Sequence, residues 1–214
     1  SRLIASLLFL LFFIYCFLFV EFPLDLRGCM NTSNVPHFSE GSPQFSRVFL
    51  ESTVYGQSLD ALVIACVDVV LIWGDHVLLG QRKQPPRDDW WVIGGRMVHG
   101  ESPLKAAQRK LQEEAGLTDI KESRLEFIGV LSTRFSERSQ PPQHHGLHSI
   151  NLTYRLKLTD AEGQGIQLDS AEYGRCQWFT LPEISHHLQN SLEMDRALAL
   201  TVKLSMTEQD TPNS

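Results

Sequence analysis

Three glutamates and four arginines or lysines lie within one short stretch of the chain, GGRMVHGESPLKAAQRKLQEEAGL, residues 94–117. The charged residues that could act together there are Glu101, Arg109, Lys110, Glu113 and Glu114. Carboxylate oxygens are the ligands that Mg²⁺ prefers, and a bound Mg²⁺ shares its coordination shell with water and substrate phosphate. Gly94 and Gly95 would let the backbone approach such an ion closely. The stretch therefore predicts metal-assisted attack of water on a diphosphate ester or its neighbour.

The residues around the glutamates predict a helix with defined ends. Ser102 can cap a helix whose first position is Pro103. Gly116 suits the left-handed residue that ends a helix, so we expect a helix over 103–115. Four apolar residues lie at helical spacing along one side, Leu104, Ala107, Leu111 and Ala115. This stripe would dock the helix on a sheet and leave the charged residues facing a cleft or solvent.

A salt-bridged helix surface is the simplest alternative to a catalytic site. Arg109 and Glu113 are four residues apart, and such pairs contribute roughly 0.2–0.5 kcal/mol each to an exposed helix. Lys110 and Glu114 have the same spacing. This alternative explains the helix, but it explains neither the glycine pair before it nor the position of Glu101 beside the helix cap.

Strands on both sides of this helix complete a layered domain. Two runs rich in β-branched residues, 62–73 and 76–82, are joined across Gly74-Asp75, which is typical of a tight hairpin turn. Further strands are expected in DDWWVIGGR (88–96), LEFIGVLSTRF (125–135), HSINLTYRLKL (148–158) and CQWFTL (176–181). An amphipathic helical tail follows at about 182–206. This order predicts an α/β fold with a mixed β-sheet.

The N-terminal region differs from the rest in composition. Residues 3–20 are apolar almost throughout, close to the roughly 20 helical residues that a membrane span needs. Two interpretations stay open: a hydrophobic helix that anchors the chain in a membrane, or an upstream extension, because Met30 is followed by a polar, start-like run. The predicted organisation is a hydrophobic segment (1–20), a linker with one short helix near 45–50 (21–57), a folded domain (58–206) and a disordered tail (207–214).

The composition favours a small ligand over a nucleic acid. The formal net charge is −6, and the 19 lysines and arginines are scattered rather than gathered in a basic run. The four cysteines, Cys16, Cys29, Cys66 and Cys176, form neither a metal-binding nor a disulfide pattern. We therefore expect free thiols and a cytoplasmic domain. The oligomeric state, a homodimer included, is left open.

The spacing of residues 95–117 resembles the Nudix box, the signature of the Nudix hydrolases. That signature is a glycine, five residues, a glutamate, seven residues, and then Arg-Glu-U-x-Glu-Glu-x-Gly-U, where U is aliphatic. Eight residues fall on it, namely Gly95, Glu101, Arg109, Leu111, Glu113, Glu114, Gly116 and Leu117. Only Lys110 departs, at the position of a glutamate that binds metal in typical members. The resemblance implies the Nudix α/β/α sandwich over 58–206 and a Mg²⁺-dependent hydrolase, with Mn²⁺ as the alternative metal.

Lys110 makes the chain similar to one exceptional branch, the GDP-mannose mannosyl hydrolases, which also lack that glutamate. Those enzymes displace GDP from the anomeric carbon of the sugar instead of splitting the diphosphate. The resemblance implies a nucleotide-sugar substrate, released as GDP and sugar, and it requires the Lys110 ammonium to turn away from the ion. Two alternatives stay open: a conventional nucleoside diphosphate pyrophosphohydrolase, and a non-catalytic Nudix module in which Lys110 replaces the charge of the metal.

The resemblance also assigns roles to individual residues. The substrate-binding residues are Asp68, Arg82 and Arg96. The metal ligands are the backbone at Gly95 and the side chains of Glu101, Glu113, Glu114 and Glu172. Arg96 and Arg109 would stabilise the charge of the departing GDP. The general base is assigned to a histidine of QHHGLHS, with His148 as the first candidate and His144 and His145 as alternatives.

Overall fold

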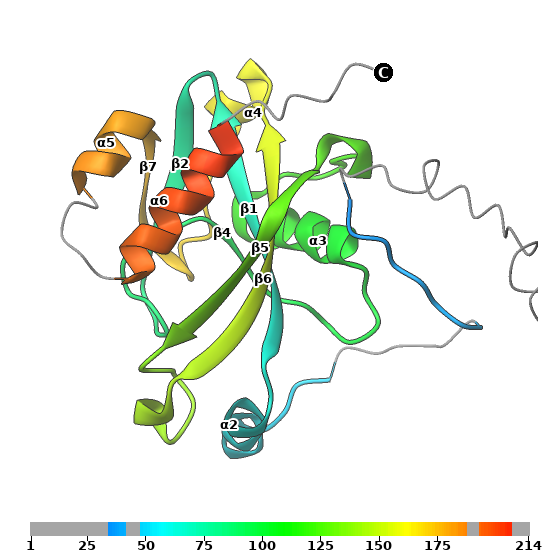
Figure 1. The fold of residues 1–214 in the computed structure, drawn as a ribbon. Coiled ribbons are helices and arrows are strands. Elements are labelled where there is room, and N and C mark those ends of the chain that lie inside the picture. The colour runs from blue at the N-terminus through cyan, green and yellow to red at the C-terminus, as the bar shows by residue number, and fades with distance from the viewer. Residues whose placement is uncertain (1–33, 42–47, 188–192, 207–214) are drawn as a thin grey trace, which may run out of the picture. The chain divides into compact units, whose positions relative to one another are not determined.

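The computed structural model describes residues 34–41, 48–187 and 193–206. These residues belong to one compact unit, which Figure 1 shows as a ribbon. The predicted hydrophobic segment 1–20 and the predicted tail 207–214 lie outside the described residues. Among the helices in the described ranges, none is both long and apolar enough to span a membrane.

A mixed sheet forms the centre of this unit. Its strands within the described residues are β1 (Ile64–Trp73), β2 (His76–Arg82), β3 (Trp90–Trp91), β4 (Ile93–Arg96), β5 (Glu126–Phe135), β6 (Leu147–Lys157) and β7 (Tyr173–Thr180). The main path runs β3-β2-β1-β6-β5, with β4 paired to β1 and β7 paired to β2. Strands β1 and β6 are parallel, while the other pairings are antiparallel, which confirms the predicted mixed sheet.

Helices lie on both faces of the sheet. Those of the described residues are α2 (Ser52–Ala61), α3 (Pro103–Ala115), α4 (Asp160–Gly165), α5 (Leu181–His187) and α6 (Glu193–Met206), with short 3-10 turns η1 (Glu122–Arg124) and η2 (Gln143–His145). The side chains of β1 point alternately to opposite faces. Val67 and Val69 pack in the core that α3 covers, and Val70 and Ile72 pack in the core that α6 covers (Figure 1). This two-sided burial explains why the sequence of β1 is apolar apart from Asp68 instead of alternating.

The ends of the main elements follow from local sequence. The hairpin between β1 and β2 turns at Gly74, whose φ of +61° favours glycine. Helix α3 has its predicted bounds, because the Ser102 hydroxyl accepts from the third helical N–H and Gly116 is left-handed. The predicted strand at 88–96 forms the two short strands β3 and β4. The predicted tail helix over 182–206 is described as α5 and α6, with residues 188–192 outside the described part.

The region before β1 differs from the prediction. Residues 48–50 are not helical, and helix α2 follows instead, so the boundary predicted at residue 58 falls inside a helix. The Arg138 side chain, which is fully buried, donates to Asp60 Oδ1 of α2 at 2.7 Å and to the Gly146 carbonyl at 3.0 Å. These bonds fasten α2 to the loop between β5 and β6. Helix α2 is therefore part of the folded unit rather than of a linker.

Candidate functional site

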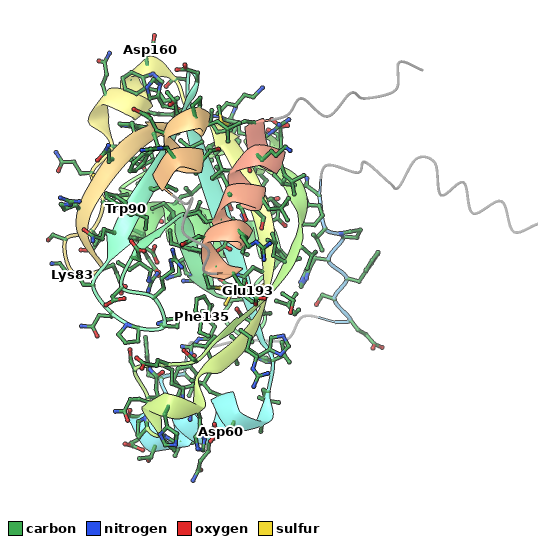
Figure 2. The ribbon with its side chains drawn as sticks, turned by 60° about the vertical axis from the view of Figure 1, so that its left-hand side comes forward. Asp60, Lys83, Trp90, Phe135, Asp160 and Glu193 are labelled. Atoms are coloured by element: carbon green, nitrogen blue, oxygen red, sulfur yellow. The ribbon has the colours of Figure 1, made fainter. Side chains whose placement is uncertain are left out.

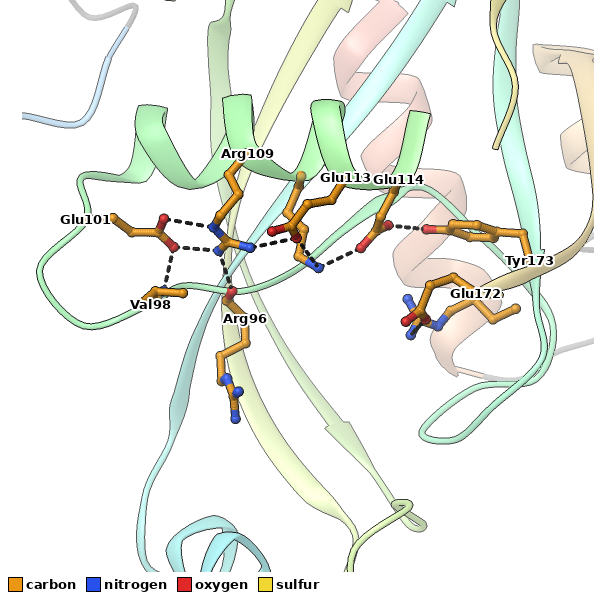
Figure 3. Close-up of polar contacts among 10 residues, drawn as sticks. Arg96, Val98, Glu101, Arg109, Glu113, Glu114, Glu172 and Tyr173 are labelled. Atoms are coloured by element: carbon orange, nitrogen blue, oxygen red, sulfur yellow. Dashed lines mark hydrogen bonds and ion pairs between the residues drawn. The ribbon is translucent and has the colours of Figure 1, made fainter. Parts of the chain in front are cut away.

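Strand β4 brings the glycine pair against β1. Gly94 and Gly95 pair with Asp68 and Val67 in antiparallel register. A Cβ atom on Gly94 would lie 2.3 Å from the Val67 carbonyl oxygen, so only glycine permits this approach. The loop after β4 then leads to α3, and the charged side of α3 faces that loop (Figure 3).

Arg109 is the centre of one hydrogen-bonded group. Its guanidinium donates to both carboxylate oxygens of Glu101, at 3.0 and 2.6 Å, and to Glu113 Oε2 at 3.0 Å. It also donates to the Arg96 carbonyl at 3.1 Å, which ties α3 to the end of β4 (Figure 3). The paired hydrogen bonds to the Glu101 carboxylate raise the pKa of Arg109. Arg109 thus positions the loop, and its donors point to protein acceptors.

Lys110 contacts two of the predicted metal ligands, Glu113 and Glu114. Its Nζ lies 2.6 Å from Glu114 Oε1 and 3.7 Å from Glu113 Oε2. The Tyr173 hydroxyl donates to the other oxygen of Glu114, Oε2, at 2.5 Å (Figure 3). Burial and the neighbouring Glu114 raise the pKa of Tyr173, so this hydroxyl stays protonated as a donor. The prediction that Lys110 turns away is wrong, because Glu114 is buried and needs a cation.

The predicted Mg²⁺ ligands do not fit a divalent ion in this arrangement. Glu101 is bound by Arg109, Glu113 by Arg109 and Lys110, and Glu114 by Lys110 and Tyr173. Glu172 is half-exposed on another element, where its Oε2 lies 3.5 Å from Arg82 Nη2. In the part of the chain that the structure describes, no group of three or more His, Cys, Asp or Glu side chains is arranged to hold a metal. The structure therefore does not gather Gly95, Glu101, Glu113, Glu114 and Glu172 into one ligand set.

A pocket of about 240 Å³ lies beside β1, next to the glycine pair. Helix α2, the loops after β2 and β5, and strands β1, β4 and β6 contribute its walls. Its charged and aromatic lining residues are Tyr55, Asp68, Arg82, Arg87, Trp91, Arg96 and Phe135. In Figure 2, Phe135 at the end of β5 is drawn between Glu193 of α6 and Asp60 of α2. The pocket thus gathers cations and rings from elements that are distant in sequence.

Asp68 is the acidic group of this pocket. Asp68 is buried, with 4% of the residue exposed, and Asn151 Nδ2 donates to Asp68 Oδ2 at 2.8 Å. The Asn151 amide is fixed in turn by Ser149 and Thr133 hydroxyls, at 2.8 and 3.2 Å from Asn151 Oδ1. Burial raises the pKa of Asp68 to about 6, although Asn151 and Arg82 act in the opposite direction. A carboxylate with such a pKa can accept a proton near neutral pH.

Two of the predicted substrate-binding arginines line the same pocket. The Arg82 guanidinium makes a long 3.5 Å contact with Glu172 and lies 6.0 Å from the ring centre of Tyr173, and its Nε is buried without a hydrogen-bond partner in the described structure. The Arg96 side chain points away from α3 (Figure 3), and its guanidinium lies 4.3 Å from the ring centre of Tyr55. Asp68, Arg82 and Arg96 therefore line the same pocket, and their role in binding substrate stays a prediction.

The predicted histidines lie elsewhere. His148 Nε2 is 2.9 Å from the Ser132 hydroxyl, and His148 lines a separate hollow with His145. His145 Nδ1 is 3.1 Å from Asp60 Oδ1, and the His144 ring packs against His145. The role of His148 as general base stays a prediction, and the pocket beside β1 holds no histidine among its described lining residues.

Sequence reasoning missed three residues of the pocket. Tyr55 lies in the region predicted to be a linker. Arg87 is buried and donates to Asp195 Oδ1 at 2.5 Å, a contact between distant segments. Asn151 had a readable signal, because polar side chains recur at every second position, 149, 151 and 153, of an otherwise apolar strand.

This chain is similar in sequence to proteins whose family is known. The model of the NUDIX domain matches residues 64–200 of this chain. An RNA pyrophosphohydrolase of Cereibacter sphaeroides is 31% identical over 128 residues, which cover 56% of this chain and 76% of that protein. The m7GpppN-mRNA hydrolase NUDT17 of Xenopus laevis is 29% identical over 149 residues, which cover 65% of this chain and 47% of that protein.

Solved structures share the fold at lower identity. The structure of a MutT NUDIX hydrolase from Burkholderia pseudomallei matches with a TM-score of 0.51 and 16% identity, over 68% of this chain and 99% of that chain. The MutT protein from Methanosarcina mazei Go1 gives a TM-score of 0.51 and 15% identity, over 68% and 96%. At these identities the likeness concerns the α/β/α fold alone.

Proposed function

Because the chain belongs to the Nudix family of hydrolases, we propose that it hydrolyses a small nucleoside diphosphate derivative, with a nucleotide sugar of the GDP-mannose type as the substrate. The observation that carries this proposal is the convergence of Asp68, Arg82 and Arg96 on one pocket. Water would attack the anomeric carbon of the sugar, and the nucleoside diphosphate would leave.

The two arginines supply the charge that a departing diphosphate needs. Guanidinium groups bind phosphate oxygens through paired N–H donors, and such bonds strengthen as negative charge develops on the leaving group. The buried Nε of Arg82 is an unsatisfied donor, which is costly unless a ligand accepts from it. A diphosphate between Arg82 and Arg96 would provide that acceptor.

Asp68 is suited to activate the water. In the proposed step, the water oxygen forms a bond to the anomeric carbon while the bond from that carbon to the diphosphate oxygen breaks. The proton of the water passes to Asp68, and the electron pair leaves with the diphosphate. The carboxylate is mostly ionised at pH 7, because its pKa is about 6, and Asn151 holds it in place.

Aromatic side chains can receive the remaining parts of the substrate. Tyr55 and Trp91 both line the pocket, and flat rings of this kind stack on nucleobases and on the apolar faces of sugars. Nudix hydrolases generally use divalent metals such as Mg²⁺ or Mn²⁺, but the predicted ligands in this chain already bind cationic side chains. The proposed step therefore differs from the metal-dependent step that the resemblance implies, and it relies on Asp68, Arg82 and Arg96.

The names of two relatives refer to RNA, which makes an RNA 5′ end the competing substrate. A long anionic polymer needs basic surface around the active site, whereas this chain carries a formal charge of −6 without a basic run. A pocket of about 240 Å³ suits one moiety of a small substrate. We therefore propose the small nucleotide derivative.

The test is product analysis with GDP-mannose in water enriched in ¹⁸O. Attack at the anomeric carbon gives GDP without ¹⁸O and labelled mannose, whereas attack at phosphorus gives GMP and mannose 1-phosphate with the label on one phosphate. RNA with a 5′-triphosphate is assayed in parallel. Turnover of the RNA alone, or no turnover of any nucleotide sugar, would overturn the proposal.

A matched pair of variants links turnover to the pocket. Arg82→Lys keeps a positive charge but loses the guanidinium fork, so we expect kcat/KM to fall roughly tenfold or more. Arg134→Lys makes the same change at an exposed position outside this pocket and should leave turnover unchanged. Equal effects of both variants would argue against a role of the Arg82 fork.

A further inference from the structure

We infer that the Lys110 ammonium takes the place of a divalent ion among the glutamates of residues 94–117, so that this chain binds a nucleoside diphosphate without metal. The inference rests on the proposed function for its ligand class. It rests on the geometry around Lys110 for its claim about the metal.

Three of the predicted metal ligands surround the ammonium. Its distances to Glu114 Oε1 and Glu113 Oε2 are 2.6 and 3.7 Å. At Gly95, a Cβ atom would lie 2.9 Å from Lys110 Cε and 3.1 Å from Lys110 Nζ, so the lysine fills the space that this glycine leaves open. The backbone at Gly95 also lines the pocket beside β1. The ammonium is thus placed between the glutamates of α3 and the wall of the proposed diphosphate site.

The neighbouring charges leave little attraction for a divalent cation. Four carboxylates were predicted as ligands, and three cationic side chains contact them, namely Arg109, Lys110 and Arg82. Four negative charges against three positive charges leave a formal net charge of −1. A Mg²⁺ ion that bound here would have to displace Lys110 and lose part of its water shell. The attraction of a single net negative charge would be its only gain.

The Lys110 pair differs from an ordinary surface salt bridge. Glu114 is 4% exposed and Lys110 17% exposed, so water screens their attraction poorly. On the same helix, Lys105 pairs with Glu122 at 2.9 Å, but Lys105 is 62% exposed. Lys105 therefore offers a control at which the same charge change is made on an exposed side chain with a different partner.

The experiment is a titration of the full chain with Mn²⁺ alone, in which electron paramagnetic resonance measures the free ion. We expect no Mn²⁺ binding by the wild-type protein below millimolar concentrations. Lys110→Glu supplies a third carboxylate beside Glu113 and Glu114 and should tighten Mn²⁺ binding by roughly tenfold or more. Lys105→Glu, with the same net charge, should behave like the wild type.

A second titration measures GDP binding by calorimetry, in EDTA and in Mg²⁺. We expect the wild-type affinity to change less than about twofold between the two conditions. Lys110→Met keeps the apolar stem and removes the charge, so it should bind GDP more weakly in EDTA. Thermal melts of each variant show whether it is folded.

The outcomes separate this inference from the proposed function. If the wild-type protein binds Mn²⁺ tightly, or loses its GDP binding in EDTA, the inferred role of Lys110 is overturned. Both results come from the wild-type protein and do not depend on any variant being folded. Failure of all folded proteins to bind GDP in either condition overturns the proposed ligand class, while the Mn²⁺ titration still decides whether Lys110 stands in for the metal.

Discussion

The charged side of α3 and the pocket beside β1 use similar residues in opposite ways. On α3 and in the loop before it, each glutamate is bound by a cation of α3, as in Glu101 with Arg109 and Glu114 with Lys110. In the pocket, Asp68 is held by the neutral amide of Asn151, and Arg82 keeps a buried donor without a partner in the described structure. The charges of one region are satisfied by the protein itself, and the other region keeps a buried donor that a ligand could satisfy.

If the proposed function is correct, this difference separates residues that stabilise the fold from residues that do chemistry. A buried pair whose charges neutralise each other has little free energy to give to a substrate, because ligand binding would have to break it. An unsatisfied donor or a carboxylate with a raised pKa costs free energy in the folded protein, and a substrate can recover that cost. The most conspicuous charges of the sequence are therefore the less reactive ones.

The largest expected effect tests the pocket directly. Asp68→Asn removes the proposed base and keeps the shape, so we expect kcat for GDP-mannose to fall by roughly 10²- to 10⁴-fold, with KM little changed. Steady-state kinetics measure both. Asp75→Asn, in the exposed turn after β1, is the control. If Asp68→Asn keeps its activity, Asp68 is not the base, and the pocket beside β1 is no more reactive than the charged side of α3.

The second prediction concerns pH and stability. The pKa of Asp68 rises from 3.8 to about 6 on folding, so between these values the folded state binds more protons than the unfolded state. The free energy of unfolding contributed by this group therefore falls as pH rises from about 4 to 6, by roughly 3 kcal/mol at most, and then levels off. Urea melts at pH 4 and 7 should show this decrease in the wild type and not in Asp68→Asn.

The same proton equilibrium should appear in the kinetics. Below pH 6, kcat/KM of the wild type should fall about tenfold per pH unit, because Asp68 becomes protonated. A profile that is flat between pH 5 and 7 would show that another group accepts the proton.

The smallest expected effect tests the charged side of α3. Arg109→Met leaves Glu101 without its guanidinium partner, and we expect the free energy of unfolding to fall by about 2 kcal/mol, as urea melts can measure. GDP affinity should change less than about threefold, because the guanidinium donates to protein acceptors. Lys105→Met is the control, with an expected effect below about 0.5 kcal/mol. A loss of affinity without a loss of stability would place Arg109 among the ligand-binding residues.

Much of the fold could be predicted because local signals and burial agree. The Ser102 cap, the Gly116 stop and the Gly74 turn depend on neighbouring residues alone, and each element forms where the sequence indicates. The apolar run of β1 predicts a strand buried on both faces. By contrast, α2 lacks a strong apolar stripe, and its place depends on Arg138 from a segment far along the chain.

The candidate site was predictable in composition but not in pairing. The resemblance pointed to Asp68, Arg82 and Arg96, which line one pocket. Asp68 also stands out in the sequence itself, because burying an unpaired charge in an apolar strand is costly. Spacing alone could not show that Lys110 points to Glu114 instead of away from it, since a lysine side chain has several rotamers of similar energy. The choice is made by the burial of Glu114, which is a property of the folded chain.

The attachment of α2 has a consequence for how the chain can be divided. The family match begins at residue 64, yet Tyr55, one wall of the pocket, comes from the helix before it and is held there by the Asp60 clamp on Arg138. A protein shortened to the matched region would keep the sheet and both of its cores while losing that wall. Substitutions in α2 that keep Asp60 and its bond to Arg138 can then change what the cavity accepts while leaving the sheet and its two cores as they are.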